Sequence, residues 1–351
     1  MASTEKKPLK LLIELAERGI LPDRLIRLGI RRLNRKRLCA ENRASNDARS
    51  EAVRRFAADL RQSPVALQTA SANQQHYELP PAFFRKILGR RMKYSGCYWP
   101  PGVERLDAAE EAMLALTCER AQVTDGMEVL DLGCGWGSLA LWIAEKYTHC
   151  RVLAVSNSRL QGEHIRAVSG AHGMDNVQVA TADMNDFHTE RRFDRVLSVE
   201  MFEHLRNWEA LLDRIAGWIL PGGKLFVHIF AHRKYAYRFE AEGEDNWMGR
   251  LFFSGGIMPA DDLLLHFQNR LAVEDQWRIN GMHYNRTALA WLNNLDRGRA
   301  EVLSILQEHY GGQHAERWLQ RWRMFFLACA ELFGFRNGEE WLISHYRLGN
   351  G

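Results

Sequence analysis

The sequence predicts an α/β protein with a mostly parallel sheet flanked by helices, an N-terminal helical extension and an inserted lid. Three observations support this prediction. Short apolar segments alternate with helical segments between residues 128 and 229, which is the pattern of parallel βαβ units. A glycine-rich turn follows the first apolar segment. The first 70 residues have helical periodicity and a charge balance of their own.

The N-terminal extension, residues 1–72, is expected to form about three helices. Residues 1–70 carry 16 Lys and Arg against 8 Asp and Glu, a net charge of +8, whereas the whole chain of 351 residues has +4. A basic helical arm can bind nucleic acid or an anionic membrane. However, Phe56 is the only aromatic residue in this part. Because bases would find no stacking platform there, no nucleic-acid partner is expected.

Residues 73–351 are expected to form one α/β domain. Strands are expected at 128–132, 151–155, 177–180, 194–199 and 225–229. Helices are expected at 137–147, 158–172 and 207–219, and two more over 299–335. Residues 231–300 are rich in aromatic residues and glycine, and this stretch is expected to form the lid.

A glycine-rich turn joins the first strand of this pattern to the first helix. The strand ends in Asp131, and Gly133, Gly135 and Gly137 follow at alternate positions before a helix begins at Ser138. Glycines let the backbone turn sharply and approach a ligand closely, and the helix N-terminus offers unpaired N–H groups. The turn therefore predicts a nucleotide-like ligand, either a dinucleotide or S-adenosylmethionine.

Two departures from the dinucleotide pattern favour the second ligand. The third glycine comes one residue early, and the second strand ends in Val155-Ser156-Asn157 instead of an acidic residue. The run from Asp131 to Gly137 resembles motif I of class I S-adenosylmethionine-dependent methyltransferases. Ala182-Asp183-Met184 after the third strand agrees with this resemblance. S-adenosylmethionine is the cofactor that the resemblance implies.

Further motifs narrow the resemblance to one family. The runs 75–80, 94–95, 156–161, 201–204 and 331–341 are similar to the cyclopropane-fatty-acid synthase family, and most of all to its amine-methylating branch of the coclaurine N-methyltransferase type. The strings Phe-Glu-His and Asn-Gly-Glu-Glu-Trp within the last two runs are specific to it. The resemblance extends over nearly the full chain.

The resemblance also implies the contacts of the cofactor. Tyr94 and Ser95 would hold the methionine end of S-adenosylmethionine. Ser156 and Gln161 would contact the ribose, the role that an acidic residue has in most class I enzymes. Further expected cofactor-binding residues are Asp131, Gly133, Gly135 and Gly137 at the turn, and Asp183 and Met184 beside the adenine.

The acceptor side of the site leaves two reactions open. In the lipid-modifying branch an alkene attacks the methyl donor, and a bound bicarbonate then removes a proton. His228 and Tyr284 fit the bicarbonate-site pattern of that branch. However, Gly96 stands where the branch has a cysteine, and Glu200 stands where it has a small neutral residue. An unsaturated phospholipid is therefore kept as the alternative substrate.

N-methylation of a small amine is the preferred interpretation. A bound ammonium must lose a proton before its nitrogen attacks, and a carboxylate with a neighbouring base serves that step. Glu200, Glu203 and His204 follow the fourth strand, at the edge where open α/β sheets bind ligands. We expect these three residues to be catalytic. The plainer alternatives are a solvated helix start for the two glutamates and a structural role for His204.

The composition disfavours several other classes. The six scattered cysteines include no C-x-x-C pair, so neither a metal site nor a disulfide scaffold is expected. The sequence shows no signal-peptide pattern and no apolar run near the roughly 20 residues that span a bilayer. A cytoplasmic protein is expected, and a homodimer is compatible with the sequence. A non-catalytic binder that uses the basic extension is the rival class.

Overall fold

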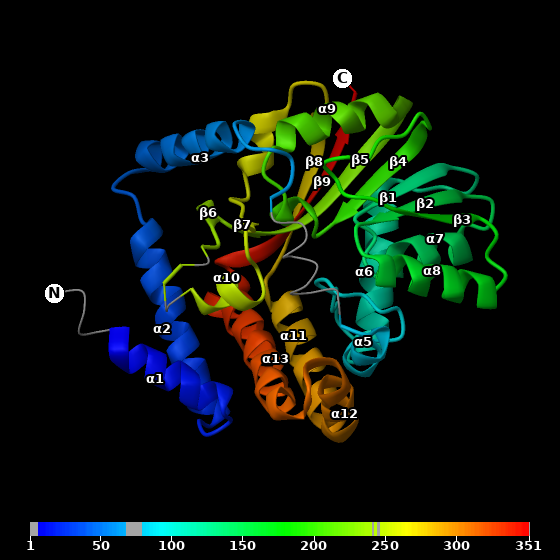
Figure 1. Ribbon diagram of the computed structural model, residues 1–351. Coiled ribbons are helices and arrows are strands. Elements are labelled where there is room, and N and C mark those ends of the chain that lie inside the picture. Colours follow the sequence, from blue (N-terminus) through cyan, green and yellow to red (C-terminus); the bar gives the residue numbers. More distant parts are fainter. Residues whose placement is uncertain (1–5, 68–78, 241, 244–245, 351) are drawn as a thin grey trace.

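The computed structural model describes residues 6–67, 79–240, 242–243 and 246–350 (Figure 1). The expected domain boundary at 72/73 lies outside these residues, and so do residues 75–78 of the family motif at 75–80. In the described part of the chain, no helix is both long enough and apolar enough to cross a membrane.

The central sheet has the strand order β3-β2-β1-β4-β5-β9-β8. The first five strands in this order are parallel, whereas β9 is antiparallel to its neighbours β5 and β8. The short strands β6 and β7 pair separately. The strands are β1 Glu128–Leu132, β2 Arg151–Ser156, β3 Val177–Thr181, β4 Phe193–Val199, β5 Ile219–His232, β6 Tyr237–Arg238, β7 Ile257–Met258, β8 Ala272–Ile279 and β9 Trp341–Gly349.

Helices cover both faces of this sheet and extend beyond one end of it (Figure 1). The helices are α1 Lys6–Glu17, α2 Asp23–Glu41, α3 Asn46–Arg61, α5 Pro81–Ile87, α6 Leu106–Ala121, α7 Ser138–Lys146, α8 Arg159–Ala171, α9 Trp208–Trp218, α10 Trp247–Leu251, α11 Met282–Arg297, α12 Arg299–Tyr310 and α13 Gly312–Phe333. Short 3₁₀ turns are η1 Phe202–His204, η2 Leu263–Phe267 and η3 Phe335–Gly338. The fold confirms the predicted α/β class with a mostly parallel sheet.

Alternation along β1 explains how the sheet is buried on both faces. Val129 belongs to a core with residues of α6, α7 and α8, whereas Leu130 and Leu132 belong to a core with residues of α9 and α3. Successive strand residues point to opposite faces, so each face receives an apolar layer. This double burial holds the C-terminal ends of β1, β2 and β4 side by side.

The predicted strands and helices between 128 and 229 are confirmed, but β8 and β9 were not predicted. β9 is buried along almost its whole length although it contains Ser344 and His345. β8 contains the run Glu274-Asp275-Gln276 in its middle and is partly exposed. Neither segment therefore has the apolar run of the parallel strands. Because β8 lies within 231–300, this expected lid also supplies part of the central sheet.

The N-terminal helices pack on two different parts of the domain. α2 lies along α13, where Arg27 and Arg31 both form ion pairs with Glu331. α3 instead packs on α9 and η2. A third core joins α1 and α2 to α5, α11, α12 and α13. The basic extension thus uses part of its charge in contacts with the rest of the chain.

Candidate active site

The glycine-rich turn has the backbone that its sequence requires. Gly133, Gly135 and Gly137 all have positive φ, at 83°, 52° and 82°, a region that other residues rarely adopt. A Cβ on Gly133 would lie 2.8 Å from Met201, and one on Gly137 would lie 2.6 Å from Ile165. A Cβ on Gly135 would meet nothing within 4 Å. The first and third glycines therefore serve packing, and the second leaves open space.

That open space belongs to a cavity at the carboxyl ends of the parallel strands. The structure brings seven of the predicted site residues to its lining. These are Tyr94, Ser95, Asp131, Gly133, Gly135, Gln161 and Glu200. The expected cofactor-binding residues and one expected catalytic residue thus share a single cavity.

The remaining predicted cofactor residues lie behind or beside this lining. Ser156 donates a hydrogen bond of 2.6 Å to Gln161 Oε1 and thereby fixes the orientation of the amide. Gly137 caps α7. Asp183 and Met184 follow β3, outside the cavity lining, and Asp183 Oδ1 accepts from the backbone N–H of Asn185 at 2.8 Å.

Two buried polar atoms in the lining fit S-adenosylmethionine. Within the described residues, Asp131 Oδ2 and Gln161 Nε2 have no hydrogen-bond partner. Burial raises the pKa of Asp131 to about 7. A cationic ligand group would satisfy the acceptor and favour its ionised form, and a ribose hydroxyl would satisfy the amide donor. An unpaired buried polar atom costs free energy, so both positions favour a ligand with these groups.

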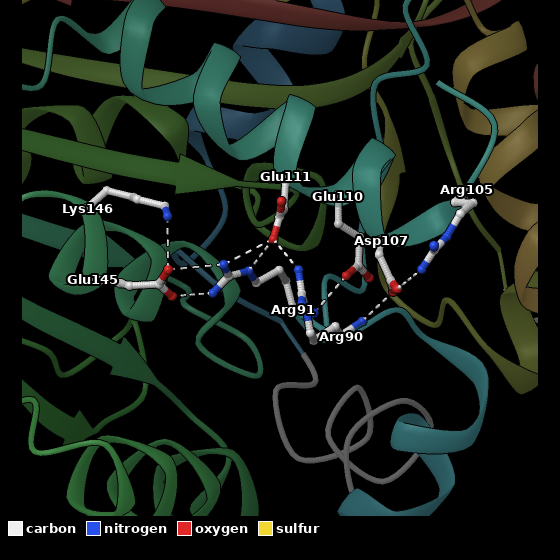
Figure 2. Close-up of polar contacts among 8 residues, drawn as sticks. All are labelled: Arg90, Arg91, Arg105, Asp107, Glu110, Glu111, Glu145 and Lys146. Carbon is white, nitrogen blue, oxygen red and sulfur yellow. Dashed lines mark hydrogen bonds and ion pairs between the residues drawn. The ribbon is translucent and has the colours of Figure 1, made fainter. Parts of the chain in front are cut away.

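The loop that carries Tyr94 and Ser95 is fastened to α6 (Figure 2). Glu110 accepts hydrogen bonds from the backbone N–H groups of Gly89, Arg91 and Lys93 at 2.9, 2.8 and 3.2 Å. The Arg91 side chain bridges Glu111 and Glu145. Lys93 is buried and donates to Ser95 Oγ at 2.5 Å and to the Gly96 carbonyl at 2.7 Å. These contacts fix the position of the loop in front of the cavity.

Glu200 follows β4 directly and has a positive φ of 48°, a strained value for a residue with a side chain. Its Oε1 accepts from the Gly96 N–H at 2.8 Å and lies 3.3 Å from His228 Nε2. Its Oε2 accepts from the Tyr284 hydroxyl at 2.8 Å. Burial raises the pKa of Glu200, and the nearby Lys93 charge and these hydrogen bonds oppose the rise.

Glu203 lies in a different environment although it is only three residues away. It is fully buried in η1, and its Oε1 accepts from the Phe230 N–H at 2.7 Å. Burial and the Glu200 charge raise the pKa of Glu203 well above its usual value. Because Glu200 has the richer set of donors, Glu203 takes up a proton first. Of the two side chains, Glu203 is therefore the more readily protonated and Glu200 the more readily ionised.

His204 ends the same turn, and its ring lies 4.5 Å from the ring of Phe253. Burial lowers the pKa of His204 to about 4, and the Glu200 charge acts in the opposite direction. The imidazole is therefore neutral near pH 7 and able to accept a proton. His204 does not line the cofactor cavity, whereas Glu200 does.

Sequence reasoning missed three residues of this region. Lys93 lies next to the Tyr94-Ser95 motif, but the sequence does not reveal that its side chain is buried. His345 lies 3.0 Å from His228, and Arg120 lies 2.9 Å from His345. Both are separated from Glu200 by long stretches of sequence. The pairing of β5 with β9 places His345 beside His228, and the packing of α6 places Arg120 beside His345.

Comparisons with known proteins agree with this geometry. Residues 66–341 match the family model described as mycolic acid cyclopropane synthetase. An (S)-coclaurine N-methyltransferase from Thalictrum flavum subsp. glaucum is 38% identical over 95% of this chain and 94% of its own length. A cyclopropane-fatty-acyl-phospholipid synthase from Escherichia coli K12 is 28% identical over 77% of this chain and 66% of its own length.

A solved structure resembles the whole chain. The crystal structure of coclaurine N-methyltransferase bound to N-methylheliamine and SAH has a TM-score of 0.94 and 36% identity, and the match covers 97% of this chain and 99% of that one. The chain therefore belongs to the mycolic acid cyclopropane synthetase family and is an S-adenosylmethionine-dependent methyltransferase.

Proposed function

We propose that this enzyme transfers a methyl group to the nitrogen of a small amine, with Glu200 and His204 assisting removal of a proton. One observation supports nitrogen over an alkene carbon. Glu200 places its own carboxylate between Gly96 N–H, His228 and Tyr284. The last two residues are those that the family resemblance assigns to a bicarbonate site. A fixed carboxylate of the chain thus takes the donors that a bound anion would need.

The charges of the site suit an amine that arrives as an ammonium. Glu200 lines the cofactor cavity and attracts the cation. Burial lowers the pKa of His204 to about 4, so the ring is neutral near pH 7 and has an unprotonated nitrogen to take the proton. The same burial weakens the base, and the Glu200 charge opposes that effect because it favours the imidazolium. Bound S-adenosylmethionine supplies a methyl group already activated on a sulfonium, so positioning and deprotonation of the amine are the tasks left to the protein.

Glu203 has a supporting part in this proposal. Its Oε1 accepts from the Phe230 N–H of β5, and its raised pKa favours the neutral acid. Glu203 therefore positions η1, and with it His204, against β5. We assign the negative charge of the acceptor site to Glu200 alone.

The substrate that we favour carries an aromatic ring. Phe253 contacts Phe230 and Phe239, with ring centroids 5.6 and 4.9 Å apart, and it also contacts His204. These partly buried rings form an apolar wall beside the base, and aromatic rings also attract cationic amines. The relatives named coclaurine, pavine and tetrahydroprotoberberine N-methyltransferases support the same class.

The organisation of the chain around this site is part of the proposal. We divide it into a basic helical extension at 1–72 and a methyltransferase domain at 73–351, with 231–300 contributing the lid. α2 and α13 are held together by ion pairs at Glu331, and Glu17 of α1 holds Arg321 and Trp247. The extension therefore caps the acceptor side. A cytoplasmic location and a homodimer stay predictions.

A methyl-transfer screen tests the function. The purified enzyme is incubated with S-adenosylmethionine carrying a labelled methyl group, and with either a panel of aromatic secondary amines or vesicles of unsaturated phospholipid. We expect label in the amine fraction. Label in the lipid fraction alone would establish the alternative, a cyclopropane-synthase-like reaction on unsaturated acyl chains. We expect the Glu200→Gly variant to transfer no methyl group to the amine. Restoration of this transfer by added bicarbonate would support the argument that Glu200 takes the place of a bound anion.

A further inference from the structure

A line of hydrogen bonds leads away from Glu200 into the sheet. His228 Nε2 lies 3.3 Å from Glu200 Oε1, and His228 Nδ1 lies 3.0 Å from His345 Nε2. His345 Nδ1 in turn lies 2.9 Å from Arg120 Nη1 at the end of α6. Both histidines are fully buried and face each other across the β5–β9 pairing. Four side chains from four different parts of the fold thus form one chain of contacts.

The last member of this line fixes the direction of every hydrogen bond in it. A guanidinium can only donate, so His345 Nδ1 must be an acceptor and its proton must lie on Nε2. His345 Nε2 then donates to His228 Nδ1. His228 consequently has its own proton on Nε2 and donates to Glu200 Oε1. One arginine at the edge of the site thereby determines the tautomers of two neutral imidazoles.

Burial of the two histidines agrees with neutral rings. Burial is the largest influence on both, and it lowers the pKa of His228 and of His345 well below the usual value. The charge of Arg120 acts in the same direction. Arg120 itself is half-buried, lies 5.1 Å from the Trp277 ring, and forms no ion pair with any carboxylate in the described part of the chain.

We propose that Arg120 and His345 are positioning residues that lock the His228 tautomer and keep an N–H group directed at the Glu200 carboxylate. This inference rests on the proposed role of Glu200. The line cannot take a proton from Glu200, because each imidazole already has its proton on the side facing Glu200. The proton removed from the substrate must therefore leave on the His204 side. The line of hydrogen bonds stabilises the charge of Glu200 and offers no path by which a proton could leave through His228.

Other charged and titratable groups also face these side chains. Those around Glu200 are Lys93, Gly96 through its N–H, Glu203, His204, His228, Tyr284 and Cys329. Those around the two histidines are Lys93 and Arg120. Removing the Arg120 donor frees His345 to reverse its tautomer, so that His228 no longer donates to Glu200. The pKa of Glu200 then rises, and activity is lost first at low pH.

Nitrogen NMR of the histidine rings tests the tautomers without any assay of activity. The full-length enzyme is labelled with ¹⁵N-histidine, and His228→Gln and His345→Gln variants assign the two spin systems. We expect both rings to be neutral with the proton on Nε2. A proton on Nδ1 of either ring, or an imidazolium at pH 7, would overturn the proposal. The result stands whether or not the enzyme methylates amines.

A pH profile tests the consequence for the reaction. In Arg120→Met we expect kcat/KM for the best amine to fall about tenfold at low pH, the worth of one charge-assisted hydrogen bond, and to approach the original value at high pH. Arg120→Lys, which keeps a donor, should recover part of the loss. A profile of Arg120→Met that coincides with that of the unmodified enzyme would overturn the proposal.

Arg347→Met is the matched control. Arg347 also lies against the Trp277 ring, at 5.6 Å, and donates to the Arg120 carbonyl at 3.1 Å, but among the described residues it has no hydrogen bond to a histidine. We expect the variant to lower the unfolding temperature without moving the acid limb of the profile. An equal shift of the limb in both arginine variants would show a general packing effect and count against the proposal. Inactivity of the unmodified enzyme toward every amine would instead contradict the proposed function.

Discussion

The two halves of the central sheet assemble their binding groups in different ways. In the cofactor half, β1 to β3, the expected groups after the strands lie near strand ends, and the bond from Ser156 to Gln161 spans five residues. In the acceptor half, Glu200 bonds to Gly96 and Tyr284 across 104 and 84 residues, and His228 meets His345 across 117. The expected cofactor-binding groups after β1 and β2 are therefore set by local sequence, whereas the loop of Tyr94 and Ser95 and the expected acceptor groups depend on long-range packing.

Removal of the Glu200 charge is the strongest test of whether the two halves of the site act separately. Glu200→Gln keeps the size of the side chain but cannot be ionised. We expect kcat for an amine to fall by about 10²–10⁴-fold, the usual worth of acid–base assistance, with the affinity for S-adenosylhomocysteine within a few-fold of the original. Steady-state kinetics and calorimetry measure the two quantities.

Glu203→Gln is the paired control for that prediction. The pKa of Glu203 is raised well above its usual value, which favours the neutral acid, so an amide should replace it with a much smaller loss of kcat. If the two glutamine variants lost equal activity, the assignment of the charge to Glu200 alone would be wrong. If Glu200→Gln also lost the cofactor, the two halves would not be separable.

The cofactor half should respond to pH through Asp131. Its pKa is raised to about 7 in the free enzyme, and a cationic ligand group would lower it, so binding below pH 7 requires the loss of a proton. We expect the affinity for S-adenosylhomocysteine to decrease up to about tenfold per pH unit below 7. Calorimetry in buffers of different ionisation enthalpy counts the released proton. The Asp131→Asn variant should bind more weakly and show a flatter profile; a profile as steep as the original would assign the proton to another group.

A pair of glycine variants tests whether the backbone conformation of the glycine-rich turn requires glycine. Gly133→Ala places a Cβ at a φ of 83° and 2.8 Å from Met201, and the left-handed conformation alone costs about 1–2 kcal/mol. A Cβ added to Gly170 in α8 would meet nothing within 4 Å, so Gly170→Ala should stabilise the fold by about 0.5–1 kcal/mol. Denaturant unfolding compares them, and equal destabilisation by both would contradict the backbone argument.

The same contrast explains what the sequence could predict. Asp131 and the three glycines were found from their spacing alone, because a strand, a turn and a helix are continuous in the chain. The parallel strands were found because they are short apolar runs. β8 and β9 were missed, since β9 buries Ser344 and His345 within its apolar residues. The partners of Glu200 were in part implied by the family resemblance, but the hydrogen bonds that join them depend on tertiary packing.

β9 comes after every other described element along the chain, and yet it lies between β5 and β8 in the sheet. During synthesis the strands β1 to β3, which end at Thr181, leave the ribosome well before β9 does. Because domains begin to fold as the chain emerges, the nascent protein has its glycine turn before His345 can reach His228. The interior position of β9 thus means that the turn after β1 can form early, whereas Glu200 acquires its full set of partners only when the last strand has joined the sheet.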